Sequence, residues 1–83
     1  MSGIKVFSQP GCGPCVSVIS ALRRAGIEPD VVDISVDIEG REFIADLGYT
    51  GTPVVYIDPD NHWQGMQADR LKALINEYKE VAA

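Results

Sequence analysis

Short hydrophobic runs and hydrophobic residues at helical spacing alternate along this chain, with breaker residues between them. The apolar-rich run at residues 4–7 predicts a first strand, which ends at the Pro- and Gly-containing stretch 8–11. Apolar residues recur at helical spacing over about residues 13–25, and Gly26 is a natural stop for such a helix. The run at residues 31–34 predicts a second strand. It should lie parallel to the first, because a helix joins the two.

A second helix is predicted between this strand and the next glycine-rich stretch. Asp37 can cap its start, and the helix should run to about Leu47, where Gly48 stops it. Phe43 and Leu47 stand one turn apart, so we expect both on the buried face. Gly40 lies inside this helix and should cost about 1 kcal/mol relative to alanine.

The remaining pattern predicts a hairpin followed by a helix. Pro53 opens a strand over residues 54–57, the stretch 58–61 is a turn, and residues 62–64 form a short antiparallel return strand. Apolar residues at i, i+3, i+4 and i+7 across residues 71–78 mark the last helix. The order βαβαββα predicts an α/β fold: a mixed four-stranded sheet flanked by three helices, with helices on both faces.

Length and composition narrow the possible functions. The 83 residues suffice for one domain, placed at residues 1–83. The net charge of -5 argues against nucleic acid as a partner, because phosphate binding needs clustered basic side chains. Arg23 and Arg24, the only basic cluster, lie at the end of a predicted helix, where their charge complements the helix dipole. No apolar run approaches the roughly 20 residues that span a bilayer. The N-terminus also lacks a signal-peptide pattern, so we expect a cytoplasmic protein without a membrane partner.

The candidate chemistry lies in Cys12-Gly13-Pro14-Cys15, which follows a predicted strand and opens a predicted helix. Closing so small a loop constrains the unfolded chain little, so a purely structural disulfide accounts for the pair poorly. Unpaired backbone N–H groups at the helix start favour the thiolate, the form of cysteine that attacks disulfides. Pro14 suits the first helical turn, and the i, i+3 spacing brings the sulfurs within bridging distance. We expect Cys12 to be exposed and Cys15 to lie behind it.

A chance pairing and a zinc site are weaker interpretations of the two cysteines. A chance pair of buried cysteines would not need this strand–turn–helix context. A closed zinc site needs four nitrogen or sulfur ligands, and the chain offers Cys12, Cys15 and His62 alone, so we expect no metal.

Thr52-Pro53 is the second candidate feature. A proline at the very start of a strand can be simple strand-edge punctuation. The interpretation we favour is a cis Thr–Pro bond facing Cys12, which the small cis penalty of X–Pro bonds permits. Such a bend would expose the backbone of Thr52 to an extended substrate strand.

These residues carry a family resemblance. The Cys-Gly-Pro-Cys loop after a strand and the downstream Thr-Pro-Val-Val are similar to the thioredoxin and glutaredoxin superfamily, and so imply the thioredoxin fold. Residues 32–35, 47–49 and above all His62-Trp63-Gln64-Gly65 resemble the NrdH-type redoxins. The likeness extends from Ile4 to about Leu74. It implies an electron donor of class Ib ribonucleotide reductase that thioredoxin reductase recharges.

The resemblance also implies roles for single residues. Cys12 matches the attacking thiol, Cys15 the resolving thiol, and Thr52-Pro53 the cis-proline loop that positions the substrate. Thiol–disulfide exchange by this pair needs no cofactor. We expect a monomer that acts on disulfide proteins.

Near the last helix the chain matches the family's signature only in part. Trp63, Gly65 and Asp69 match, whereas different residues fill the remaining positions: Gln64, Met66, Gln67 and Ala68. The family's arginine is a glutamine here, which removes a charge from a polar network. For Trp63, core packing and partner docking both stay open.

Two alternatives come from different classes of redox protein. Glutathione-dependent glutaredoxins usually carry a lysine before the first cysteine, where this chain has Gln9, and a Gly-Gly and acidic motif where it has residues 64–67. This enzyme alternative therefore ranks below the NrdH-like one. The second alternative is an iron–sulfur carrier in which Cys12 of two chains holds one cluster. Dicysteine sites do this less readily than monothiol ones.

Overall fold

The computed structural model describes residues 3–82, with side chains as far as residue 80. The elements follow the predicted order, and their ends differ from the expected ones by a residue or a few. They are β1 (Lys5–Ser8), α1 (Gly13–Arg24), β2 (Asp30–Asp33), α2 (Ile38–Asp46), β3 (Val54–Asp58), β4 (Asn61–Gln64) and α3 (Ala68–Ala82). No helix in this part of the chain is long and apolar enough to cross a membrane.

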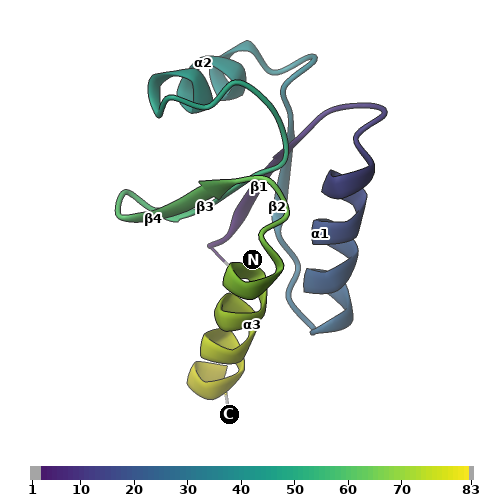
Figure 1. The fold of residues 1–83 in the computed structure, drawn as a ribbon, viewed down its shortest axis with the longest axis vertical. Coiled ribbons are helices and arrows are strands. Elements are labelled where there is room, and N and C mark those ends of the chain that lie inside the picture. Colours follow the sequence, from purple (N-terminus) through teal and green to yellow (C-terminus); the bar gives the residue numbers. More distant parts are fainter. Residues whose placement is uncertain (1–2, 83) are drawn as a thin grey trace.

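The four strands form one mixed sheet in the order β2-β1-β3-β4. β1 and β2 are parallel, as the connecting helix predicts, and β3 is antiparallel to both β1 and β4. The carboxyl ends of β1 and β2 therefore lie at the same end of the sheet as the start of β3. This end carries the loops before α1 and before β3 (Figure 1).

Helices cover both faces of the sheet, as predicted (Figure 1). Alternate strand residues point to opposite faces. Val6 and Val55 face α1 and α3 in the larger core cluster, where Leu22 of α1 and Leu71 of α3 are buried against them. The other face has a smaller cluster under α2, formed by Phe7, Ile44 and Val54. This arrangement is the thioredoxin-like fold.

The second helix begins as predicted but presents a different face to the sheet. The Asp37 carboxylate accepts a hydrogen bond from the N–H of Gly40 at 2.8 Å and caps α2. Gly40 and Ile44, one turn apart, are the buried residues of this helix. The expectation that Phe43 lies on the buried face is wrong, because its side chain is 40% exposed. Its ring still contacts the two central strands, stacking on Phe7 with centroids 5.6 Å apart and meeting Tyr56 edge to face at 5.0 Å.

A glycine is needed at position 40 because the helix lies close to β2. A Cβ atom there would stand 2.7 Å from Cγ1 of Val32, well inside ordinary carbon–carbon contact. The propensity cost of this glycine is thus offset by the close approach of α2 to the sheet.

Candidate functional site

The two cysteines lie where the sequence predicts, at the junction of β1 and α1. Cys12 is the N-cap of α1, and its Sγ accepts a hydrogen bond from the Cys15 N–H at 3.2 Å. Cys12 is partly exposed, whereas Cys15 is 1% exposed and packs behind it. The pair forms a disulfide with an S–S distance of 2.09 Å and Cα atoms 5.3 Å apart.

This placement gives the two sulfurs different tasks when the pair is reduced. Pro14 occupies the first turn of α1, where the missing N–H removes no helical hydrogen bond. The first turn holds no acidic residue, so no negative side chain there opposes the positive end of the helix dipole. A thiolate at Cys12 would be stabilised by the N–H that already points at its Sγ. The accessible sulfur is therefore suited to attack and the buried one to resolve.

The loop before β3 has the predicted cis peptide bond between Thr52 and Pro53. The carbonyl of Pro53 accepts a hydrogen bond of 2.7 Å from the N–H of Gly65, which ties the loop to the end of β4. Gly65 has φ +90, a left-handed conformation that favours glycine. Within residues 3–82 the N–H and C=O of Thr52 make no backbone hydrogen bond. That peptide edge is free to pair with another chain.

Gln9 is a residue of this site that the sequence pattern did not single out beyond its lack of charge. Its side-chain Nε2 donates a hydrogen bond to Oγ1 of Thr52 at 2.9 Å. The bond joins the loop that carries Cys12 to the loop that carries Pro53. Only the strand register could have indicated it, because the two residues are 43 positions apart.

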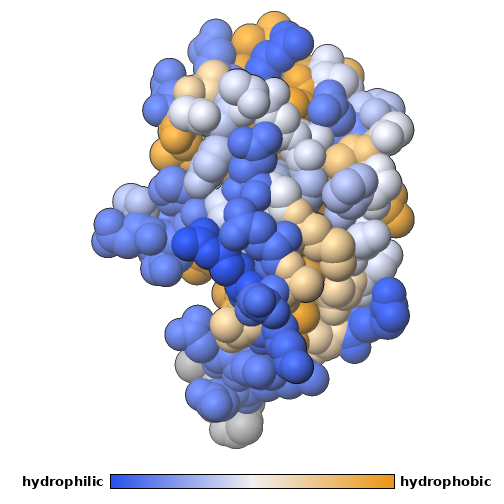
Figure 2. Space-filling model, viewed as in Figure 1, coloured by the Kyte–Doolittle hydropathy of each residue, from blue (hydrophilic) through white to orange (hydrophobic). Residues whose placement is uncertain are grey.

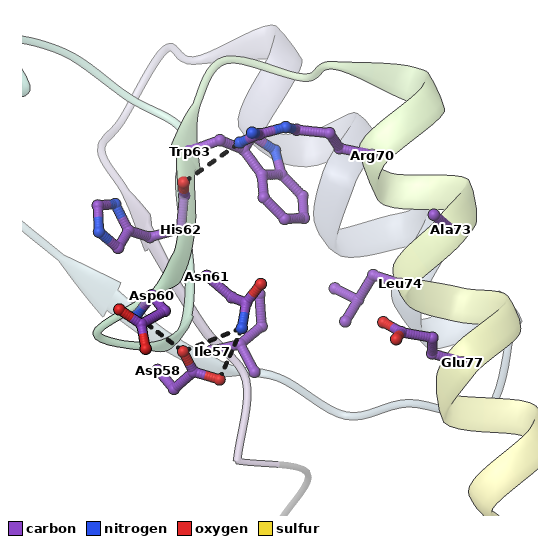
Figure 3. Close-up of a pocket in the computed structure, with 10 residues that line it drawn as sticks. All are labelled: Ile57, Asp58, Asp60, Asn61, His62, Trp63, Arg70, Ala73, Leu74 and Glu77. Carbon is purple, nitrogen blue, oxygen red and sulfur yellow. Dashed lines mark hydrogen bonds between the residues drawn. The ribbon is translucent and has the colours of Figure 1, made fainter.

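Trp63 belongs to the core. Its side chain is 6% exposed, and it lies opposite Val55 in the β3–β4 ladder within the larger core cluster. The Arg70 guanidinium lies 5.6 Å from the ring centroid and also donates to the carbonyl of His62 at 3.3 Å. Figure 3 shows the indole between β4 and α3, beneath Arg70. Of the two roles left open for Trp63, this burial fits packing.

A cavity of about 410 Å³ lies between the β3–β4 hairpin and α3, and contains neither cysteine (Figure 3). Ile57, Trp63 and Leu74 line its apolar part, and Asp58 and Glu77 lie at its rim. Disulfide exchange therefore takes place on the open surface at Cys12 and not in this cavity.

Within residues 3–82, no group of three or more His, Cys, Asp or Glu side chains is placed to hold a metal ion. His62 is instead hydrogen-bonded through Nδ1 to the hydroxyl of Tyr49 at 2.6 Å.

Charged side chains are scarce in the segments that surround Cys12. Residues 6–22, 47–57 and 61–68 contain no Asp, Glu, Lys or Arg, although 23% of the chain is charged. Residues 33–40, after β2, contain three acidic residues and no basic one. On the face drawn in Figure 2, hydrophilic residues dominate the lower part, over α3. In the upper part, where α2 lies, hydrophobic residues are interspersed with hydrophilic ones.

The sequence model of the glutaredoxin family matches residues 4–63. The chain belongs to the glutaredoxin family. It is a glutaredoxin-like thiol–disulfide oxidoreductase whose redox-active pair is Cys12 and Cys15.

The chain is also similar to a phage protein and to solved structures. The Gene 56 protein of Mycobacterium phage D29 is 36% identical over 76 residues, which cover 90% of this chain and 84% of that protein. The thioredoxin-like protein BC3987 is 32% identical, with a TM-score of 0.77 over 86% of this chain and 97% of that one. The glutaredoxin-like NrdH-redoxin from Escherichia coli, at 22% identity, shares the fold with a TM-score of 0.77, covering 86% and 92%.

Proposed function

We propose that this protein reduces disulfides of other proteins, that thioredoxin reductase recharges it, and that class Ib ribonucleotide reductase is its main acceptor. The Cys12 thiolate attacks one sulfur of the partner's disulfide. A mixed disulfide forms, and the partner's other sulfur leaves as a thiolate and takes up a proton. The Cys15 thiolate then attacks Cys12, and the partner's second sulfur leaves. Two electrons have moved: the partner is a dithiol and Cys12–Cys15 is a disulfide.

Two features of the chain support a protein disulfide as substrate. The free backbone edge of Thr52 can hold an extended segment by strand-like hydrogen bonds. Val16, which follows Cys15, and Met66, which follows Gly65, are exposed and offer apolar surface to a polypeptide partner. Both features suit a polypeptide better than a small thiol.

The observation that carries the choice of electron source is the lack of basic side chains around Cys12. Glutathione has two carboxylates, which are held best by charge-assisted hydrogen bonds. Residues 6–22, 33–40, 47–57 and 61–69 contain no Lys or Arg. Position 9, close to the site, holds a neutral amide that is already bonded to Thr52. Glutathione would therefore be bound weakly.

Two further points support thioredoxin reductase. The Gly13-Pro14 pair between the cysteines is the thioredoxin pair, which that reductase recognises. The E. coli NrdH-redoxin, which shares this fold, has a thioredoxin-like activity profile. A reduction potential near that of thioredoxin, about -270 mV, would suit recharging by NADPH through this route.

The test measures NADPH consumption with one disulfide acceptor and two electron sources. Thioredoxin reductase from a related organism should sustain turnover, and glutathione with glutathione reductase should do so poorly. Faster consumption in the glutathione system would overturn the proposal and favour a glutathione-dependent glutaredoxin. Replacing the acceptor by the oxidised class Ib ribonucleotide reductase tests the last step, since deoxyribonucleotide formation should then depend on this protein.

The iron–sulfur alternative is tested by the purified protein itself. A cluster held by Cys12 of two chains would colour an anaerobic preparation brown and give visible absorption. We expect a colourless protein, reconstituted or not.

A further inference from the structure

Gln9 and Thr52 face each other at the point where the backbone ladder between β1 and β3 stops. The antiparallel pairing ends with Phe7 opposite Val54. Continuing the same register by two residues places Gln9 opposite Thr52. Within the described residues no backbone hydrogen bond joins these two. Instead, Gln9 Nε2 donates a hydrogen bond to Thr52 Oγ1 at 2.9 Å, so a bond between side chains holds the two segments together just beyond the end of the ladder.

The use of a side-chain bond in place of a backbone bond has a consequence for the Thr52 backbone. In an antiparallel ladder, every second pair of opposed residues exchanges both N–H···O=C bonds, which uses up the backbone groups of that pair. Here the side chain of Gln9 ties the two segments together while the peptide groups of Thr52 stay free. The site thus keeps its shape without closing the edge that another chain needs.

We propose that Gln9 is a positioning residue for disulfide exchange, holding Thr52 at a set distance from the loop that carries Cys12. A partner strand bonded to the Thr52 backbone then presents its sulfur to Cys12 in line for attack. The proposal rests on the proposed function, because it assumes a polypeptide substrate.

The chemistry of the amide suits this task. A glutamine side chain does not ionise, so the spacing stays the same across the pH range in which thiols titrate. It also places no charge beside a thiolate at Cys12. Reacting atoms must approach within about 3–3.5 Å in a set orientation, so loss of the tie should slow attack on a bound strand. A small disulfide reagent that makes no contact with Thr52 should be unaffected.

The experiment mixes the pre-reduced protein with a disulfide in a single turnover, so that neither a reductase nor ribonucleotide reductase is needed. One substrate is insulin, a protein disulfide, and the other is a small aromatic disulfide. Gln9→Ala and Thr52→Val should each lower the second-order rate constant with insulin by about three- to tenfold, as expected for one hydrogen bond. Both variants should stay within about twofold of the wild type with the small reagent.

Matched variants test the length of the side chain at position 9 and the hydroxyl at position 52. Gln9→Asn keeps the amide but is one methylene shorter, so it should lose rate as Gln9→Ala does. Thr52→Ser keeps the hydroxyl and should recover most of what Thr52→Val loses. The double variant Gln9→Ala/Thr52→Val should be no slower than either single variant, because both remove the same bond. Asn76→Ala, an exposed amide on α3, controls for loss of an amide elsewhere.

The outcomes separate this inference from the proposed function. If the wild type reduces insulin and the Gln9 variants match it, the positioning role is overturned and the proposed function stands. Equal losses on both substrates, or additive losses in the double variant, would also overturn it. If the wild type reduces the small reagent but not insulin, the proposed protein-disulfide substrate fails first.

Discussion

The hydroxyl of Tyr49 lies 2.6 Å from Nδ1 of His62, so the segment before the cis-proline loop is hydrogen-bonded to β4. The two rings also meet edge to face, with centroids 5.6 Å apart, and the imidazole stacks on Tyr56 at 5.9 Å. Tyr49 lies three residues after the last residue of α2, so this contact fixes the path of the chain from the helix toward Pro53.

Tyr49→Phe should lower the free energy of unfolding by about 0.5–1.5 kcal/mol, because it removes this hydrogen bond and leaves the ring in place. Urea denaturation measures the loss. Tyr56→Phe is the matched control: it deletes a hydroxyl that makes no hydrogen bond within the described residues, next to the same imidazole. Equal losses in the two variants would show that the 2.6 Å contact contributes no stability.

Replacing either cysteine should separate attack from resolution. Cys12→Ser should abolish turnover, because the remaining Cys15 is 1% exposed and out of reach of a partner. Cys15→Ser should attack normally and then stop as a covalent adduct, visible on a non-reducing gel. In the reduced wild type, iodoacetamide should label Cys12 first, and below the pH at which a free thiol reacts. Preferential labelling of Cys15 would contradict the assigned roles.

Because α2 lies close to β2, we expect the effect of Gly40→Ala on stability to change sign when Val32 is replaced by alanine. Gly40→Ala gains about 1 kcal/mol of helix propensity, yet its Cβ would stand 2.7 Å from a methyl of Val32. Valine is stiff about χ1, so the overlap should cost more than the gain, and the variant should be destabilised by about 1 kcal/mol.

In a Val32→Ala background the same Gly40→Ala change should stabilise, because the obstructing methyl is gone. Gly13→Ala is the control for a glycine-to-alanine change in a helix without a steric obstacle, because a Cβ atom at position 13 would meet nothing within 4 Å. Its effect is measured on the free energy of unfolding, not on activity. Destabilisation of similar size in both backgrounds would show that the methyl of Val32 is not the obstacle.

At the turn between β3 and β4 lies a carboxyl group, that of Asp58, whose pKa is lowered by its surroundings. The side-chain amide of Asn61, and then the N–H of Asp60, hold the pKa of Asp58 below its usual value by hydrogen bonds to the carboxylate. A lowered pKa in the folded state adds stability above the unfolded value, about 3.9, and this is lost as the pH falls through the folded value.

Asn61→Ala should therefore raise the pKa of Asp58 in a carboxyl NMR titration. The stability difference between wild type and variant should shrink as the pH drops below about 4. The pKa of Asp33, which is lowered by hydrogen bonds from Ser35, should not respond to Asn61→Ala. An unchanged Asp58 titration would exclude Asn61 as the cause.

The sequence determines much of this fold through local signals. The strand before Cys12, the helix after it and the cap at Asp37 each follow from neighbouring residues, and the structure has all three. Helical spacing across residues 71–78 likewise predicted α3. Such features do not depend on knowing what lies on the other side of the sheet.

Features that depend on distant partners could not be predicted from the pattern. In the short helix α2, the pairs Gly40/Ile44 and Phe43/Leu47 both have helical spacing, so the sequence pattern alone does not show which pair faces the sheet. The close contact between Gly40 and Val32 of β2 determines that the first pair does. The choice between core and docking for Trp63 needed its burial against the larger cluster. The Gln9–Thr52 bond needed a strand register that no local pattern contains.

The burial of Trp63 gives the protein a built-in optical probe. It is the only tryptophan in the chain, and it lies between the sheet and α3 in the larger core cluster. Its emission should be blue-shifted in the folded state and move to the red when that cluster opens to water. Unfolding in urea can then be followed from one known position without a label. The smaller cluster under α2 contains no tryptophan, so its opening would be silent in this signal. Fluorescence and far-UV circular dichroism measured together would therefore show whether the two faces of the sheet unfold in one step.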